Sequence, residues 1–362
     1  MKKITSMILA LVFAVSLIGS ASAKTLKIQL TFPKTSYDGQ IVKMWTDRVT
    51  QLTRGELKFE LLSKGEVVGM KETLEAVDKG LVDGGAAWTH YWSNYHPAAM
   101  LFGSPVAGGG IGLSTKSWLA WYFDNGGKEL YDRLWNEMGM NVKGFVMASS
   151  GPEALGWFKE PIKNMDDFRK YRFRTPPGIP GQTYKDIGIA SVSLSGGDIL
   201  PALEKGTIDA AEWCCPKPDS VFGFQKVLKN YYLQGLHQNV VNGDIYINGD
   251  VYNSLTDHQK YAMEVASEAM ITRNITNRAV ENGKALIDLT ENHGVKLWDT
   301  PADYFTEYMN AAQATLKKNA ASNAFFKEVY EHMTAHARIV VPFIAQMETS
   351  DASIGTAFAS QQ

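Results

Sequence analysis

The chain has 362 residues, with 36 Lys and Arg against 38 Asp and Glu, and a formal net charge of −2. A charge so close to zero gives no electrostatic basis for nucleic-acid binding. The length allows two domains or one large domain, and two cysteines are too few for a disulfide-based framework.

The first 23 residues predict a cleaved secretory signal. Two lysines precede an apolar run over residues 7–18, and small residues then lead to Ala-Ser-Ala at 21–23, an A-x-A cleavage site. The apolar run is shorter than the ~20 residues of a membrane span. A retained N-terminal anchor is the alternative, which the A-x-A site disfavours. We therefore expect a soluble mature protein that begins at Lys24 and lies outside the inner membrane.

The most informative feature is an internal repeat. "LEAVDKGLVDGGAAW" (74–88) is echoed by "LPALEKGTIDAAEW" (200–213). In each copy, apolar residues at helical spacing lead to an acidic residue, a lysine and a glycine. Gly80 and Gly206 are expected to end these helices, since glycine readily adopts the left-handed C′ conformation. A short strand is predicted after each glycine.

The echo extends towards the N-terminus of each copy, so that each half is predicted to run strand–helix–strand–helix–strand. Such alternation favours an α/β fold with mostly parallel sheets and two similar lobes. A chance resemblance between two α/β segments is the alternative, because such units are common. The further predicted elements are strand 26–33, helix 40–53 and a strand from 57, and then strand 171–178, helix 181–187 and a strand from 191.

Candidate binding residues follow from the rule that open α/β sheets bind ligands beyond the carboxyl ends of their strands. In the second half these residues are Arg174, after "YRF", and Glu212 and Trp213, after "TIDAA". Two lobes that face each other would bring them close to the matching positions of the first half, which are Thr31–Phe32 and Ala87–Trp88, with Tyr91 and Trp92 just beyond.

The residue types suggest a site for an anion and a cation. Arg174 offers a planar, permanently charged fork suited to a small carboxylate, although a surface arginine is the common alternative. Glu212 lies in a strand that should be buried, where a carboxylate must be paired or bind a cation. A salt bridge to Arg174 and a hard cation such as Na⁺ or Ca²⁺ are both open.

Evidence for an enzyme is thin. The sequence lacks G-x-S-x-G, H-E-x-x-H, a P-loop and a nucleotide-binding glycine motif. A hydrolase that uses Glu212, or Cys214 or Cys215 with His237 as base, is the alternative. Adjacent Cα atoms lie about 3.8 Å apart, so a vicinal disulfide would be strained. A disulfide and two small buried thiols are both open for this pair.

Three segments carry a family resemblance: "GWFKEPIKNMDDFRKYRFRTPPG", "SLSGGDILPALEKGTIDAAEW" and "YYLQGLHQ". They resemble the solute receptors of tripartite ATP-independent periplasmic (TRAP) transporters, of the dicarboxylate-receptor type. The similarity covers essentially the whole mature chain. It is closest to the branch that binds 2-oxo acids and related small monocarboxylates such as pyruvate or lactate.

The resemblance implies a two-lobed periplasmic binding protein, with the ligand cleft between the lobes, a long inter-lobe helix and a helix-rich C-terminus. The lobes are expected to close over the ligand. The polar C-terminal tail is expected to be loose. The approximate divisions are a signal peptide at 1–23, lobe I at 24–148 and 239–280, lobe II at 149–238 and 281–347, and a tail at 348–362.

The resemblance also implies roles for individual residues. Arg174 would bind the substrate carboxylate, and a Ca²⁺ or Na⁺ ion would bridge protein and substrate. Its ligands would be Glu212, the backbone oxygen of Trp213, and Gln238. In that branch one more metal ligand is a glutamine, and the corresponding residue here is Ser149. Three alternatives follow for this position: a serine oxygen as ligand, a water molecule as ligand, or loss of the metal. The aromatic wall from the first lobe would be Trp88, Tyr91 and Trp92.

Together these observations predict a receptor and not an enzyme. It would capture a small 2-oxo or 2-hydroxy monocarboxylate and deliver it to the membrane subunits of a TRAP transporter. A receptor for a larger carboxylate, a sugar acid or a sulfonate is the alternative within this class. The helix-rich C-terminal part could cover the lobes or form a homodimer.

Overall fold

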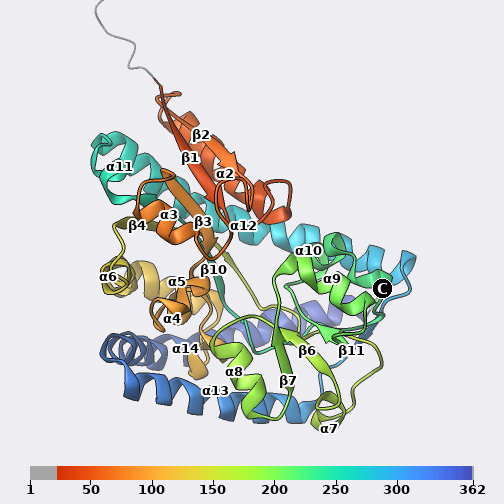
Figure 1. Ribbon diagram of the computed structural model, residues 1–362. Coiled ribbons are helices and arrows are strands. Elements are labelled where there is room, and N and C mark those ends of the chain that lie inside the picture. The colour runs from red at the N-terminus through yellow and green to blue at the C-terminus, as the bar shows by residue number, and fades with distance from the viewer. Residues whose placement is uncertain (1–22, 361–362) are drawn as a thin grey trace, which may run out of the picture.

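The computed structural model describes residues 23–360, which form two mixed β-sheets flanked by helices (Figure 1). The predicted signal peptide lies outside the described residues, except for Ala23. The α/β two-lobed fold predicted from the sequence is confirmed. Among residues 23–360, no helix combines the length and the apolar character that a membrane crossing requires.

The first sheet has five strands in the order β2-β1-β3-β10-β4. Its core is aliphatic, and helix α2 packs on it through Trp45, which is fully buried. The strands are β1 (Lys24–Leu30), β2 (Leu57–Leu62), β3 (Gly84–Trp88), β4 (Val142–Ser150) and β10 (Val241–Asn248). The adjoining helices are α2 (Tyr37–Leu52), α3 (Thr73–Asp78) and α11 (Gly249–Asn253).

The second sheet has six short strands in the order β11-β9-β5-β8-β6-β7. They are β5 (Gly156–Phe158), β6 (Arg172–Thr175), β7 (Ala190–Ser193), β8 (Ala210–Ala211), β9 (Asn230–Tyr232) and β11 (Lys296–Trp298). The helices of this part are α7 (Met165–Phe168), α8 (Ile179–Asp186), α9 (Gly196–Glu204), α10 (Pro216–Phe222) and the 3-10 helix η3 (Phe224–Lys226).

The internal repeat is real in three dimensions. The triplets β2-β1-β3 and β7-β6-β8 have the same order, and all their pairings are parallel. Gly80 and Gly206 have φ of 68° and 67°, as the predicted helix ends require. Asp83 and Asp209 also match, because each carboxylate accepts a hydrogen bond from the backbone N–H of the adjacent strand, at Lys27 and Arg172.

The sheets are less parallel than predicted, because the chain crosses between them. β10 pairs antiparallel with both β3 and β4, and β5 pairs antiparallel with both β8 and β9. The connections β4 to β5 and β9 to β10 each pass from one sheet to the other. The ends of β4 and β10 lie side by side there, with Ser150 opposite Val241.

Helix α12 (Asp257–Asn292) is the third connection between the two sheets, and Figure 1 shows it running diagonally past both. A capping box at Thr256 and Gln259 starts it. It packs on α2 and β4 in its first part and on α10 further along. The indole N–H of Trp45 donates to Ser267 Oγ at 2.8 Å, which fixes α12 to the first sheet's main helix. This is the long inter-lobe helix predicted from the sequence.

An aromatic core lies between the first sheet and the C-terminal helices. Trp118, Trp121, Tyr131 and Trp135 are fully buried, and their rings contact one another or Phe102, mostly edge-on. Core packing therefore accounts for these rings without assigning them to a binding site. The helices here are η1 (Thr89–Asn94), α4 (Ala99–Gly103), η2 (Val106–Gly110), α5 (Thr115–Asp124) and α6 (Gly127–Glu137).

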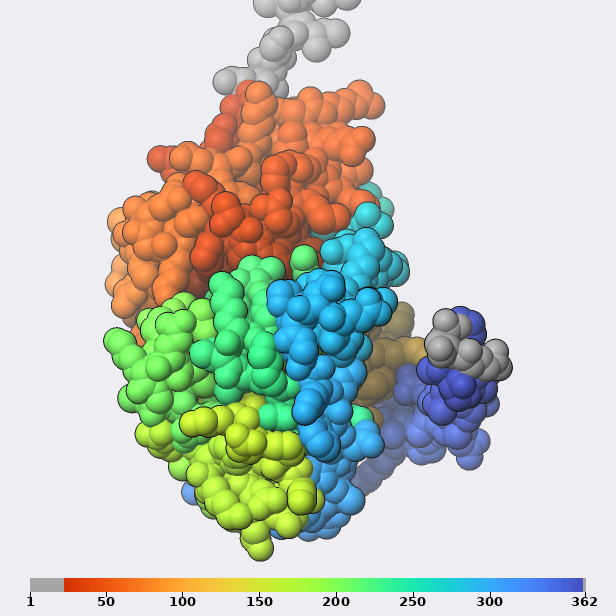
Figure 2. All heavy atoms as spheres, turned by 90° about the vertical axis from the view of Figure 1, so that its right-hand side faces the viewer, coloured from red at the N-terminus to blue at the C-terminus, as the bar shows by residue number. Residues whose placement is uncertain are grey.

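The C-terminal part consists of α13 (Ala302–Ser322) and α14 (Ala324–Ala359). A loose tail was expected from residue 348, but α14 continues as a helix to Ala359. Its last turns stand out from the body of the protein at the right of Figure 2. Five apolar side chains of α14 are exposed by 56–73%, namely Ile339, Phe343, Met347, Ile354 and Phe358.

Candidate functional site

A small pocket lies where the two sheets and α12 meet. Trp88 and Tyr91 line it from the end of β3 and the following turn. Arg174 from β6 and Trp213 from the end of β8 line it from the second sheet. Glu153 and Gln238, on the two crossing connections, also contribute to the lining. Residues far apart in the sequence thus converge at the carboxyl ends of the repeated strands, as predicted.

Arg174 is only 4% exposed, and its guanidinium is held in a fixed orientation. Nη1 donates to the backbone oxygen of Glu212 at 2.9 Å and to Glu212 Oε1 at 2.5 Å. Nε and Nη2 both donate to the backbone oxygen of Leu194. The Trp213 ring lies 5.1 Å from the guanidinium carbon. Arg174 is therefore a buried, preoriented cation that faces the pocket.

Three buried groups form a cluster beside Arg174. Ligand atoms of Glu153, Glu212 and His237 all lie within 4.8 Å of one another. Glu212 Oε2 and Glu153 Oε2 are buried and have no hydrogen-bond partner among the described residues. His237 Nε2 lies 3.6 Å from Glu212 Oε2. Two unsatisfied carboxylate oxygens so close together match the ligand chemistry of a hard cation.

The two carboxyl groups of the cluster have opposite electrostatics. Burial opposes ionisation of Glu212, but Arg174 and His237 outweigh it, and the pKa of Glu212 is lowered. Burial raises the pKa of Glu153 well above its usual value, and the nearby Glu212 charge raises it further. One arginine therefore compensates Glu212, while Glu153 lacks a comparable counter-charge.

His90 and Tyr91 form an aromatic wall beside the cluster. His90 is 3% exposed, and burial lowers its pKa to about 4, so the imidazole is neutral at pH 7. Its ring meets Tyr91 edge-on at 5.0 Å between centroids. The pocket therefore offers the preoriented guanidinium of Arg174, two carboxyl groups that each have one oxygen without a partner among the described residues, and flat aromatic walls. It can hold a small planar anion, and it can hold a cation.

Comparison with known proteins identifies the family. Residues 30–323 match the bacterial extracellular solute-binding proteins, family 7. The monocarboxylate 2-oxoacid-binding periplasmic protein of Nostoc sp. is 32% identical over 295 residues, which is 80% of this chain and 77% of that protein. This chain is a family 7 solute-binding protein. The members of this family and the structural neighbours are receptors for solutes and not enzymes.

Solved structures of TRAP solute-binding proteins share the fold of this family 7 protein. That of Bordetella bronchiseptica, a dimer with calcium and picolinate in one site, gives a TM-score of 0.86 at 25% identity and covers 94% of this chain and 99% of that one. That of Colwellia psychrerythraea, with calcium and pyruvate, gives 0.85 at 22% identity, with 92% and 99% covered. That of Pseudoalteromonas atlantica, with sodium and pyruvate, gives 0.84 at 21% identity, with the same coverage.

Two of the predicted site residues of this solute-binding protein lie away from the pocket. Trp92 is 1% exposed and packs edge-on against Tyr95 and Tyr246 in the core, so it does not form part of the wall. Ser149 is fully buried in β4, where its Oγ donates to Asn242 Oδ1 at 2.6 Å. Glu153, four residues after Ser149 on the connection from β4 to β5, is the residue that brings a carboxyl group into the cluster.

The residues near the pocket that were not anticipated as ligand or metal contacts include Asp38, Glu153, His237 and Arg278. Asp38 and Arg278 lie on helices, and Glu153 lies on a crossing connection, so the strand-end rule does not reach them. One signal was available for Glu153, a single acid at the start of the apolar run "EALGWF". A carboxylate so placed is expected to be buried and to need a partner.

The adjacent cysteines are buried and both are free, in the chain from residue 23 to 360. The sulfur atoms of Cys214 and Cys215 lie 3.2 and 3.5 Å from Arg278 Nη1. His237 faces Glu212 and the Tyr184 ring. The hypothesis of a thiol–imidazole pair therefore finds no support in this geometry.

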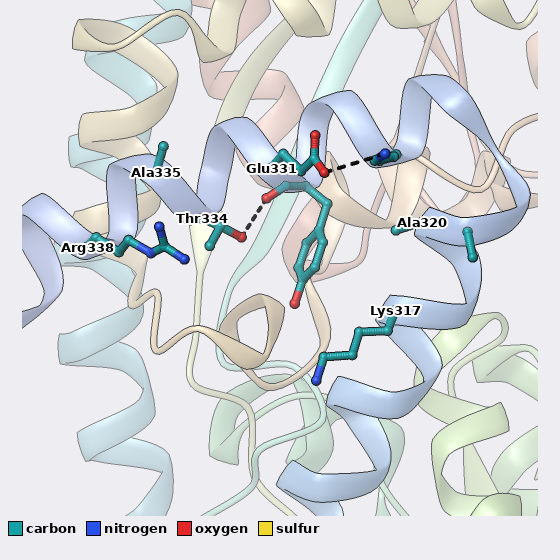
Figure 3. Close-up of a pocket in the computed structure, with 9 residues that line it drawn as sticks. Lys317, Ala320, Glu331, Thr334, Ala335 and Arg338 are labelled. Atoms are coloured by element: carbon teal, nitrogen blue, oxygen red, sulfur yellow. Dashed lines mark hydrogen bonds and ion pairs between the residues drawn. The ribbon is translucent and has the colours of Figure 1, made fainter.

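A larger hollow lies elsewhere, between α13 and α14 (Figure 3). Lys317 and Arg338 border it, and Tyr330 is among its lining residues. It is an open groove on the surface, bordered by ordinary exposed side chains, and it contains none of the residues of the buried cluster. The buried cluster lies in the small pocket between the sheets and not in this groove.

Proposed function

We propose that this protein captures a small 2-oxo or 2-hydroxy monocarboxylate, such as pyruvate or lactate, and delivers it to the membrane subunits of a TRAP transporter. The observation that carries the proposal is the buried, preoriented Arg174 in a small aromatic pocket, beside two carboxyl groups that each have one oxygen without a partner among the described residues. The 2-oxoacid-binding relative from Nostoc supports the ligand class.

The roles of the residues follow from their positions. Arg174 provides the positive charge for the ligand carboxylate, and its bonds to Leu194 and Glu212 fix its direction beforehand. Trp88, Tyr91 and Trp213 cover the flat faces of a short planar acid. Because these groups come from both sheets, the ligand favours the closed arrangement of the lobes.

We infer that Glu212, Glu153, Gln238 and the backbone oxygen of Trp213 hold the cation. The fit rests on the two carboxylate oxygens that lack partners among residues 23–360. When bound, the cation supplies a second positive centre for the oxygens of the ligand. Two carboxylates in one site favour Ca²⁺ over Na⁺, because the affinity of a site for Ca²⁺ depends on how many of its coordinating groups are negatively charged.

Glu153→Gln is expected to weaken Ca²⁺ binding at least tenfold and to leave Na⁺ able to support ligand binding. The amide keeps an oxygen ligand but removes one negative charge. Titration calorimetry with Ca²⁺ in saturating pyruvate measures the effect. Glu160→Gln is the matched control, because this exposed residue lies on the same segment outside the pocket. Equal Ca²⁺ affinity of Glu153→Gln and the unaltered protein would exclude Glu153 as a ligand.

The function itself is tested by titrating the purified protein with a series of acids in the presence of Ca²⁺. Stoichiometric binding of pyruvate or lactate, without turnover, is the expected result. Binding of only larger acids, sugar acids or sulfonates would replace the proposed ligand class. Product formation that Glu212→Gln or thiol alkylation abolishes would favour the hydrolase alternative.

We propose that the chain is exported with cleavage after Ala23, consistent with the extracytoplasmic character of its family. The support is the charged start, the short apolar run and the A-x-A site. The intact mass of protein recovered from the periplasm tests this. A mature N-terminus at Lys24 is expected, and a retained leader would contradict it.

We also propose that two copies associate through α14. Its five exposed apolar residues, defined above, fall on one stripe about 100° wide at about 100° per residue. The Bordetella bronchiseptica relative crystallised as a dimer. Phe343→Glu is expected to convert a dimer into a monomer, measured by light scattering at micromolar concentration. Ala352→Glu, on the opposite face of α14, is the control that should stay dimeric. A monomeric unaltered protein would contradict the proposal.

A further inference from the structure

A second arginine reaches the ligand pocket, from α12. Arg278 is 6% exposed and lines the same cavity as Arg174. Its guanidinium lies near the rings of Tyr37 and Trp88, with its carbon 4.8 and 5.9 Å from the two ring centroids. A buried guanidinium in an anion pocket is a ready partner for a carboxylate. The pocket would therefore suit an acid with two carboxylates, unless the charge of Arg278 is otherwise compensated.

Asp38 supplies that compensation. It lies in the first turn of α2 and also lines the pocket, and its Oδ1 accepts from Arg278 Nη2 at 2.8 Å. Burial raises the pKa of Asp38, while the guanidinium opposes this by favouring the carboxylate. The ion pair is largely buried, with side-chain exposures of 7% for Arg278 and 12% for Asp38.

The other partners of Arg278 are neutral or weak acceptors. Nε donates to Asn274 Oδ1 at 3.2 Å. Nη1 faces the sulfur atoms of Cys214 and Cys215, and thiols accept hydrogen bonds only weakly. Asp38 is thus the one carboxylate in hydrogen-bond contact with Arg278 in the described part of the chain. Its loss would leave a buried guanidinium without a matched anion, facing the ligand.

We propose that Asp38 restricts this receptor to acids with a single carboxylate, by holding Arg278 in a neutral pair within the ligand pocket. The inference rests on the proposed function and names the residue that sets its charge specificity. Two effects act together. The ion pair occupies the donor edge that a second carboxylate would need, and the Asp38 carboxylate repels that group. Arg174 is left as the anchor for the one carboxylate that enters.

Asp38→Asn tests this with two ligands of equal chain length, 2-oxovalerate and 2-oxoglutarate, which differ only in a terminal methyl or carboxylate group. Titration calorimetry in Ca²⁺ gives both dissociation constants. The unaltered protein should prefer 2-oxovalerate. In Asp38→Asn the ratio of affinities should move at least tenfold towards 2-oxoglutarate. Removing Arg278 as well, in Asp38→Asn/Arg278→Met, should abolish this gain. Asp47→Asn, an exposed aspartate of the same helix, is the control.

The outcomes separate this inference from the function on which it rests. If the unaltered protein binds no monocarboxylate, the proposed function fails. If it binds 2-oxovalerate and folded Asp38→Asn keeps the same ratio, the inference about Asp38 is overturned and the function stands. Asp38→Ser is a second variant in case the amide disturbs folding, because its hydroxyl is small and leaves room for water beside Arg278. An unchanged ratio in either folded variant counts against the proposal.

Discussion

Arg174→Ala is expected to raise the dissociation constant for pyruvate by about 100-fold or more. Truncating one member of a buried, hydrogen-bonded charge pair typically costs ~2–5 kcal/mol of binding free energy, and about 2.7 kcal/mol corresponds to 100-fold. The ligand would lose its anchor. The Glu212 carboxylate would also lose its guanidinium partner, whose Nη1 lies 2.5 Å from Glu212 Oε1. Titration calorimetry in Ca²⁺ measures the loss.

Arg172→Ala is the matched control for that experiment. Arg172 precedes Arg174 by two residues on β6, but it is half-exposed and pairs with Asp209 outside the pocket. Its removal should leave the pyruvate affinity within twofold. Thermal unfolding without ligand separates lost binding from lost folding, since Arg174→Ala also leaves a buried carboxylate unpaired. Full affinity in a folded Arg174→Ala protein would refute the assignment of the anchor.

Chelation of divalent cations is expected to remove most of the stabilisation that pyruvate provides. A ligand present at 100 times its dissociation constant adds about 2.7 kcal/mol to the free energy of unfolding. With an unfolding entropy of about 2.1 cal/mol/K per residue, this corresponds to a shift of about 4 °C in Tm for a chain of this length. EDTA should reverse that shift, because Glu153 and Glu212 would face the ligand without a compensating cation.

Restoring Ca²⁺ in excess over the chelator should recover the lost stabilisation. Glu212→Gln provides an internal comparison, since its Tm in pyruvate should no longer respond to EDTA. Differential scanning fluorimetry measures the Tm of both proteins in pyruvate, with Ca²⁺, with EDTA and after Ca²⁺ is restored. The comparison is made in buffer without Na⁺. If pyruvate then raised the Tm of the unaltered protein equally with and without EDTA, the proposed cation would have no part in binding.

Much of the fold could be predicted because its units are local. The two repeats carry their own helix ends and strands, so Gly80, Gly206 and the flanking apolar patterns predicted the triplets β2-β1-β3 and β7-β6-β8. The antiparallel pairings of β10 and β5 join strands that are distant in the sequence. No local pattern specifies such pairings, and the sequence alone therefore predicted sheets that were too parallel.

The same distinction applies to the site. Arg174, Trp88 and Trp213 lie at or just beyond the carboxyl ends of their strands, and the strand-end rule predicted their position in the pocket. Glu153 and Arg278 reach the pocket from a crossing connection and from a helix of 36 residues, where the path of the chain must be known first. Trp92 and Ser149 were misplaced because an aromatic or hydroxyl side chain near a strand end can equally face the core.

The place of β10 in the first sheet has a consequence for the biosynthesis of the protein. β3 and β4 are joined in the sheet only through β10, whose last residue is Asn248. In a nascent chain that ends before β10, the triplet β2-β1-β3 and the single strand β4 are not joined, and each has an open edge. Long-range pairings of this kind form late and leave the chain open to aggregation. Completion of the first sheet must therefore wait until the polypeptide has been made as far as β10.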